Sequence, residues 1–165
     1  MGCKPFDRID PNKERLLSTI SERLKELGIV IPVLPKPVAA YIPAQITGNL
    51  IYASGQTPTI DGKLVYSGRV GEDLTIEEAY QAARLAALNC LAELQTALGD
   101  LERIEKIVRV TGYVRSAPGF GEQPKVINGA SELLEQVFGE AGKHARAALG
   151  VNELPFGAPV EVELI

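Results

Sequence analysis

Residues 75–99 constrain the fold more than any other part of the sequence. Thr75 and Glu78 have the spacing of a helix capping box, and Gly99 follows the last apolar residue, where helices commonly end. The helix predicted between them has one wide apolar face made mostly of small side chains: Ala79, Ala82, Ala83, Ala86, Ala87, Cys90, Leu91, Leu94 and Leu98. Small side chains allow a close approach, so this helix is expected to pack tightly against a sheet.

Further strands and a second long helix are predicted after residue 99. Residues 104–115 alternate with period two, which is typical of a half-buried strand. A helix is expected over residues 125–138, and two final strands over residues 145–151 and 159–165. The segment 116–123 contains Pro and Gly and is predicted to be a loop.

Before residue 75 the sequence predicts a helix and two short hairpin-like units. Residues 11–27 have apolar side chains at helical spacing and stop at Gly28, and the proline-rich residues 29–44 are expected to be extended. Gly48-Asn49 predicts a turn before a strand over 50–54, and Asp61-Gly62 predicts a hairpin whose returning strand covers 64–66.

This order of elements favours one α+β domain over residues 1–165. Two helices on one face of a mixed sheet form a two-layer fold, with the helix near the N-terminus as an extra element. No other helix is available for the second sheet face. We therefore expect a homo-oligomer that packs sheet against sheet.

Composition disfavours several classes of function. The chain of 165 residues has a net charge of −4, no Trp and 5% aromatic residues, which disfavours nucleic-acid binding. Cys3, Cys90 and His144 are far apart, so no metal site is expected. No targeting signal or membrane-spanning segment is recognised, and a cytoplasmic location is expected.

Several segments, in order and at compatible spacing, resemble the YjgF/RidA family of reactive-intermediate deaminases, also called L-PSP endoribonucleases. The resemblance covers residues 37–165, and residues 1–30 form a helical extension. It is carried by Gly48 to Pro58 (GNLIYASGQTP), Leu98-Gly99-Asp100, Asn128, Phe138, Ala145-Arg146, Leu154-Pro155 and Val160-Glu161-Val162-Glu163.

The resemblance implies a chorismate-mutase-like fold and a homotrimer with sites in clefts between subunits. It also implies hydrolysis of imines and enamines such as 2-aminoacrylate to a 2-keto acid and ammonia, without a metal or organic cofactor. The sequence departs from the family pattern in four features. His144 stands where many members have Pro, and Ala148 where many have Cys. The region 116–143 is a few residues longer than in the archetypal members, and the helix predicted over residues 11–27 is an addition. These departures indicate a divergent subgroup.

Arg146 and Glu161 are the candidate catalytic residues. Arg146 matches the family's Ala-Arg pair, and its guanidinium would bind the substrate carboxylate through two hydrogen bonds. Glu161 matches a family glutamate and would hold the attacking water or relay its proton. The structural alternatives are an ion pair across the sheet for Arg146 and a solvent-facing strand position for Glu161.

Four further residues are candidates for substrate binding: Tyr41, Ser54, Gly55 and Asn128. Tyr41 would either line the cleft or pack in the core. Ser54-Gly55 would either offer backbone N–H groups to the substrate or simply end a strand. Asn128 is expected at the start of a helix, either as a site residue or as the N-cap. His144 is expected to be an exposed strand-entry residue, with a pH-dependent role on the Arg146 face as the alternative. Cys90 is expected to be a buried small apolar residue and Cys3 to lie near a mobile terminus.

Three functions remain open from the sequence. The favoured one is a deaminase acting on 2-imino or enamino acids. A non-catalytic protein that binds a small keto or other carboxylic acid, with Arg146 still essential, is the alternative. An endoribonuclease is least favoured, since one His and a net acidic chain offer little for RNA cleavage.

Overall fold

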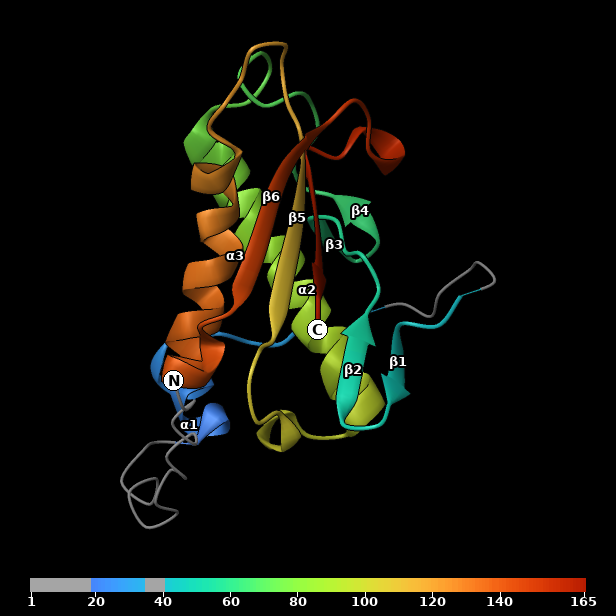
Figure 1. Cartoon of the computed structure of the whole chain (residues 1–165), viewed down its shortest axis with the longest axis vertical. Coiled ribbons are helices and arrows are strands. Elements are labelled where there is room, and N and C mark those ends of the chain that lie inside the picture. The colour runs from blue at the N-terminus through green and yellow to red at the C-terminus, as the bar shows by residue number, and fades with distance from the viewer. Residues whose placement is uncertain (1–18, 35–40) are drawn as a thin grey trace, which may run out of the picture.

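The computed structural model describes residues 19–34 and 41–165 (Figure 1). Its helices are α1 (Ile20–Glu26), α2 (Ile76–Leu98) and α3 (Gln123–Phe138). Its strands are β1 (Ala44–Thr47), β2 (Leu50–Ala53), β3 (Thr59–Ile60), β4 (Lys63–Leu64), β5 (Arg109–Arg115), β6 (Ala145–Val151) and β7 (Val160–Leu164). Single 3-10 turns cover Leu101–Arg103, Gly139–Gly142 and Pro155–Gly157.

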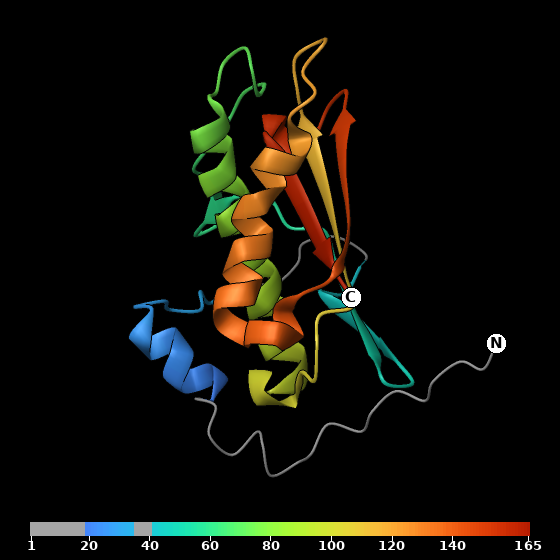
Figure 2. The same ribbon diagram turned by 60° about the vertical axis from the view of Figure 1, so that its left-hand side comes forward.

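The main sheet is mixed, with β5 at its centre. β5 runs parallel to β6 and antiparallel to β7, and Gln56 extends the sheet through a bridge to Val162. Both long helices lie side by side on one face of this sheet (Figure 2). The predicted two-layer α+β fold is confirmed.

Close packing between the layers depends on small residues. The five alanines of α2 at positions 79, 82, 83, 86 and 87 are fully buried. A Cβ atom on Gly129 of α3 would lie 2.0 Å from the Tyr80 carbonyl oxygen, and one on Gly112 of β5 would lie 2.3 Å from Ile127 Cδ1. The two helices and the sheet therefore approach to distances that no larger residue at these positions would allow.

The strand register decides which side chains face the helices. On β5, Val110 and Val114 are fully buried, and on β7 so are Val160 and Val162. The residues between them, such as Tyr113 and the glutamates of β7, project from the other face. No helix in the described part of the chain covers that face (Figure 2).

Most predicted elements are present, with shifted boundaries. The helix near the N-terminus begins after Thr19, whose side chain caps it in a box with Glu22, and residues 11–18 lie outside the described residues. The strand predicted from residue 104 starts at Arg109, because residues 104–107 cross from α2 to the sheet and Ile107 N–H bonds to the Ala141 carbonyl instead of a strand. α3 begins at Gln123, two residues earlier than predicted.

The two short hairpins follow the predicted turns. Gly48 and Asn49 connect β1 to β2. Asp61 and Gly62 both adopt positive φ between β3 and β4, but the returning strand is Lys63–Leu64 rather than residues 64–66. Of the proline-rich segment, residues 29–34 form neither helix nor strand, and residues 35–40 lie outside the described residues.

Two buried polar side chains of α2 hold the chain between β2 and β3 against the helix. Asn89 Nδ2 donates to the carbonyl oxygens of Thr57 and Thr59, both at 3.0 Å. Glu93 is 5% exposed and its Oε1 accepts from Gln56 Nε2 at 2.8 Å, while Oε2 has no hydrogen-bond partner. Burial raises the pKa of Glu93 to about 8, and the nearby backbone of Ser54 opposes the shift more weakly.

Gly129→Ala is expected to destabilise the fold, since the new methyl group would meet the Tyr80 backbone and push α2 and α3 apart. Overpacking costs about 1–3 kcal/mol or more, which exceeds the roughly 1 kcal/mol gained in helix propensity. Chemical denaturation at one protein concentration measures the difference. The control is Gly121→Ala, where a Cβ atom has no neighbour within 4 Å. Equal stability of both variants would contradict this account of the packing.

The Glu93→Gln variant should become more stable than the wild type as the pH rises. The carboxyl of Glu93 has its pKa raised from 4.5 to about 8 in the folded state, so its stabilising contribution is complete below pH 4.5 and is lost as the pH rises toward 8. Glutamine keeps the acceptor for Gln56 without the charge. The variant should therefore match the wild type at pH 4.5 and exceed it at pH 8 by on the order of 1–3 kcal/mol. A stability difference independent of pH would refute this.

Candidate active site

Arg146 lies on β6 with its side chain on the side of the sheet that carries α3. Its Cα partner across the sheet is Val110, which faces the helices. Nη1 donates to Asn128 Oδ1 at 2.8 Å and to Ser131 Oγ at 3.0 Å. Both acceptors are neutral, and no carboxylate among the described residues pairs with this guanidinium. The alternative of an ion pair across the sheet is therefore wrong for the described chain.

Asn128 and Ser131 reach Arg146 because they lie three residues apart on one face of α3. The sequence predicts that Asn128 opens the helix, but α3 begins five residues earlier and its N-cap, Glu122, makes no side-chain capping bond. The N-cap interpretation of Asn128 is therefore wrong, because a residue more than one turn into the helix cannot cap it. Its side chain is instead free to orient the guanidinium.

His144 is half-buried and hydrogen-bonded, so the expectation of an exposed strand-entry residue is wrong. The reason is the 3-10 turn before β6, which brings the Gly142 carbonyl oxygen to 2.6 Å from Nδ1 while Ser131 Oγ lies 3.0 Å from Nε2. His144 and Arg146 share a face, as the strand spacing predicts. Burial, helped by the charge of Arg146, lowers the pKa of His144 below 6.5.

These residues surround a polar hollow of roughly 210 Å³ at the surface, between the C-terminal half of α3 and the start of β6. Its lining residues are Ser131, Glu135, Gly142, Lys143, His144 and Arg146. Lys143 and Arg146 supply positive charge, and Lys143 pairs with Glu140 at 2.6 Å. The hollow thus combines a fixed guanidinium, a hydroxyl and an imidazole.

Glu161 lies on the opposite face of the sheet. Its Cα partner is Tyr113, whose hydroxyl donates to the neighbouring Glu163 at 3.2 Å. A Cβ atom on Gly55 would lie 2.1 Å from Glu161 Oε1, so a larger residue at position 55 would displace the carboxylate of Glu161. Burial and then the charge of Glu163 raise the pKa of Glu161 above 4.5.

Ser54 lies between the end of β2 and Gly55, and Tyr41 lies in the segment that precedes β1. The Ser54 hydroxyl donates to the Ile42 carbonyl oxygen at 2.8 Å, and its backbone N–H donates to the Pro43 carbonyl oxygen. Tyr41 is 53% exposed, so it does not pack in the core of the described chain. Ser54 therefore fastens the segment before β1 to the end of β2.

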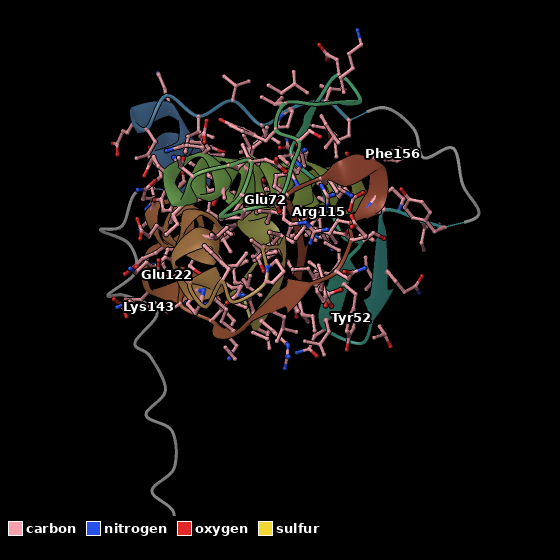
Figure 3. All side chains as sticks on the ribbon, turned by 90° about the horizontal axis from the view of Figure 1, so that it is seen from above. Tyr52, Glu72, Arg115, Glu122, Lys143 and Phe156 are labelled. Carbon is pink, nitrogen blue, oxygen red and sulfur yellow. The ribbon has the colours of Figure 1, made fainter. Side chains whose placement is uncertain are left out.

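The candidate residues fall into two groups that one chain does not bring together. Arg146, Asn128 and His144 meet on the α3 side, whereas Gly55 and Glu161 meet on the open face. In the register of the sheet, Glu161 is aligned with Leu149, three residues along β6 from Arg146. In Figure 3, Lys143, which lines the hollow, and Tyr52 of β2 lie at opposite sides of the molecule.

Sequence reasoning missed Ser131, Gln56 and Glu93. Ser131 could have been found as the residue one helical turn beyond Asn128. Gln56 Nε2 contacts both Glu93 Oε1 and, at 3.1 Å, the Gly55 carbonyl oxygen. A buried glutamate therefore supports the backbone against which Glu161 lies, a relation that nothing in the linear sequence marks.

The described residues contain no group of three or more His, Cys, Asp or Glu residues arranged to hold a metal ion. Cys90 is fully buried and its thiol donates to the Val162 carbonyl oxygen at 3.1 Å, and burial raises its pKa well above the usual 9.0. The prediction that Cys90 is a buried small residue is confirmed, while Cys3 lies outside the described residues. None of the described helices is both long and apolar enough to cross a bilayer.

Comparison with known proteins places this architecture in a known group. Protein TCP17 of Trypanosoma cruzi is 42% identical over 147 residues, covering 88% of this chain and 92% of the relative. A 2-iminobutanoate/2-iminopropanoate deaminase of Dermatophagoides farinae is 28% identical over 137 residues, covering 83% and 92%. A crystal structure of a protein of unknown function from Agrobacterium tumefaciens is 48% identical, with a TM-score of 0.82 over 88% of this chain and 90% of that one.

A family model described as "YjgF/chorismate_mutase-like, putative endoribonuclease" matches residues 21–164, nearly all of the described chain. The sheet, the two packed helices and the order of the motifs agree with that match. The chain therefore belongs to the YjgF/chorismate-mutase-like family.

Proposed function

We propose that the protein hydrolyses 2-imino acids, and the enamines that tautomerise to them, to the 2-keto acid and ammonia. The observation that carries the proposal is Arg146, a guanidinium held by two neutral oxygens in a polar surface hollow. The similarity to a relative named 2-iminobutanoate/2-iminopropanoate deaminase supports the same reaction. The net charge of −4 does not favour RNA as a substrate.

Arg146 would bind the carboxylate that every 2-imino acid carries. Asn128 and Ser131 both engage Nη1, and among the described residues neither Nε nor Nη2 has a hydrogen-bond partner. That free edge of the guanidinium has the geometry for two parallel bonds to a carboxylate. Since the imine carbon is bonded directly to the carboxylate carbon, clamping the carboxylate also fixes the reacting centre.

The second half of the site would come from another copy of the chain. Glu161 and Gly55 lie on the open sheet face, away from Arg146 in the same chain. Packing three copies with these faces inward would cover the open sheets and could bring Glu161 of one subunit to Arg146 of the next. The homotrimer is thus part of the proposal. In the site between two subunits, the ionised Glu161 accepts a hydrogen bond from the attacking water and so orients that water.

The remaining alternative is a protein that binds small carboxylic acids without turning them over. It uses Arg146 in the same way. Ala148 leaves β6 without a thiol near Arg146, so neither function would use a cysteine nucleophile there. Binding of 2-oxobutanoate without accelerated imine decay would decide for this alternative.

Arg146→Ala is expected to abolish most of the activity. Imines are generated from amino acids by an amino-acid oxidase, and their decay is followed with and without the protein. Two charge-assisted hydrogen bonds contribute about 3 kcal/mol or more, which corresponds to a loss of about 100-fold in kcat/KM. Arg84→Gln, on the outer side of α2, is the matched control and should retain activity. Full activity of Arg146→Ala would rule out the carboxylate clamp.

Glu161→Gln is expected to lower kcat by about 10- to 100-fold with little change in KM, because it weakens the hold on water and not on the carboxylate. Wild-type activity should rise with pH through the pKa of Glu161, which lies above 4.5, since the ionised form is the acceptor. Glu163→Gln removes the neighbouring charge and should move this rise to lower pH. An unchanged profile in both variants would exclude Glu161 from the reaction.

A further inference from the structure

Ser131 and His144 form a hydrogen-bonded pair directly beside Arg146. Gly142 O can only accept a hydrogen bond, so the proton of the neutral imidazole lies on Nδ1. Nε2 is then an acceptor, and the Ser131 hydroxyl, 3.0 Å away, must donate to it. The backbone carbonyl thus orients the imidazole, and the imidazole orients the serine hydroxyl. A hydroxyl, a base and a group that orients the base are the parts of an activated hydroxyl in enzymes.

The hydroxyl of Ser131 has one remaining place for a hydrogen-bond donor. Its proton goes to His144, and one of its two lone pairs accepts Nη1 of Arg146 at 3.0 Å. The second lone pair is available to a water molecule in the hollow. A carboxylate on the free Nε–Nη2 edge of Arg146 lies on the side of the guanidinium away from Nη1 and Ser131, so a second water molecule in the hollow would connect the Ser131 hydroxyl to the water beside the imine carbon.

We propose that Ser131 and His144 form a proton relay that activates water against the 2-imino acid held by Arg146. The inference rests on the proposed function for its substrate. His144 is the base of the relay and Ser131 connects it to the water. In this arrangement Glu161 of a neighbouring subunit orients the water, while the proton leaves toward α3.

The proton balance of the reaction closes with these groups. The imine reacts in its N-protonated form, C=NH2⁺. The water oxygen bonds to the imine carbon as the electron pair of the C=N π bond moves to nitrogen. One water proton passes, through the intervening water, to Ser131 Oγ while the serine proton passes to His144 Nε2. The imidazolium then returns a proton through Ser131 to the amino nitrogen of the carbinolamine. The C–N bond breaks, its electron pair leaves with ammonia, and the hydroxyl oxygen forms the keto group. The hydroxyl proton ends on ammonia, giving ammonium.

The surroundings of His144 favour a neutral base at neutral pH. Its charged neighbours are Arg146 on β6, Glu135 on α3 and, adjacent in sequence, Lys143, which pairs with Glu135 and Glu140. Burial and Arg146 lower the pKa of His144, and the hydrogen bond to Gly142 and the charge of Glu135 oppose them more weakly. Binding of a carboxylate would offset the charge of Arg146. The pKa of His144 should therefore rise when a substrate or product is bound.

The relay is tested first by NMR, without catalysis. His144 is the only histidine of the chain, so its imidazole gives a single set of signals. The nitrogen shifts should show the Nδ1–H form, and a pH titration should give a pKa below 6.5 that rises on addition of 2-oxobutanoate. Arg146→Gln should remove this rise. The other tautomer, or a pKa unmoved by a bound oxo acid, would overturn the relay even if the protein hydrolyses imines.

Kinetics give the second test. His144→Gln keeps an acceptor for Ser131 but cannot take a proton, so kcat should fall by about 100-fold and the limb of the pH profile that matches the NMR pKa should vanish. Ser131→Ala should give a similar loss, and Ser131→Thr should restore part of it. Ser67→Ala, an exposed serine whose hydroxyl bonds to Gly157 O, is the matched control.

The two proposals fail in different ways. If the wild type hydrolyses imines and His144→Gln keeps its kcat and pH profile, the relay is wrong and the deaminase function stands. If the wild type accelerates no imine, the deaminase function is wrong. In that case a pKa of His144 that responds to 2-oxobutanoate through Arg146 still supports the coupling of the three residues, and an unresponsive one refutes it.

Discussion

The close contact between the alanine face of α2, α3 and the central strand is the constraint on which the rest of the structure depends. The backbone of α3 touches that of α2 at Gly129 and the sheet lies against α3 at Gly112, so there is little freedom in how the layers slide. Tightly packed interiors respond to small changes in volume. This contact sets the distance between α3 and β6, and that distance lets Asn128 and Ser131 reach Arg146.

The sheet divides the candidate chemistry between its two faces. Arg146 is one of the β6 residues whose side chains face α3. Glu161 is one of the β7 residues whose side chains face away from the helices. Alternation in a strand is strict, so no small adjustment within one chain can bring the two side chains together. A shared site between copies follows from this geometry as a proposal, and it agrees with the open sheet face that no described helix covers.

Buried polar groups connect the core to both groups of residues. On one side, Glu93 holds Gln56, whose side chain also contacts the carbonyl oxygen of Gly55, beside Glu161. On the other, the carbonyl of Gly142 fixes the tautomer of His144, which in turn orients Ser131. In the second case the carbonyl oxygen can only accept a hydrogen bond, and this fixes which nitrogen of the neighbouring imidazole carries the proton.

The sequence by itself determined the elements and the family, since capping residues, turn glycines and hydrophobic periodicity are local signals. Thr75, Glu78 and Gly99 mark α2, and the motif around Arg146 identifies the fold. Local signals do not report which side chains meet across 13 or more residues, as Ser131 and His144 do. The start of α3 before Asn128, the burial of His144 and the opposite faces of Arg146 and Glu161 were decided only by the tertiary structure. The physical reason is that these properties depend on the packing of α3 on the sheet and on strand register, which no short stretch of sequence contains.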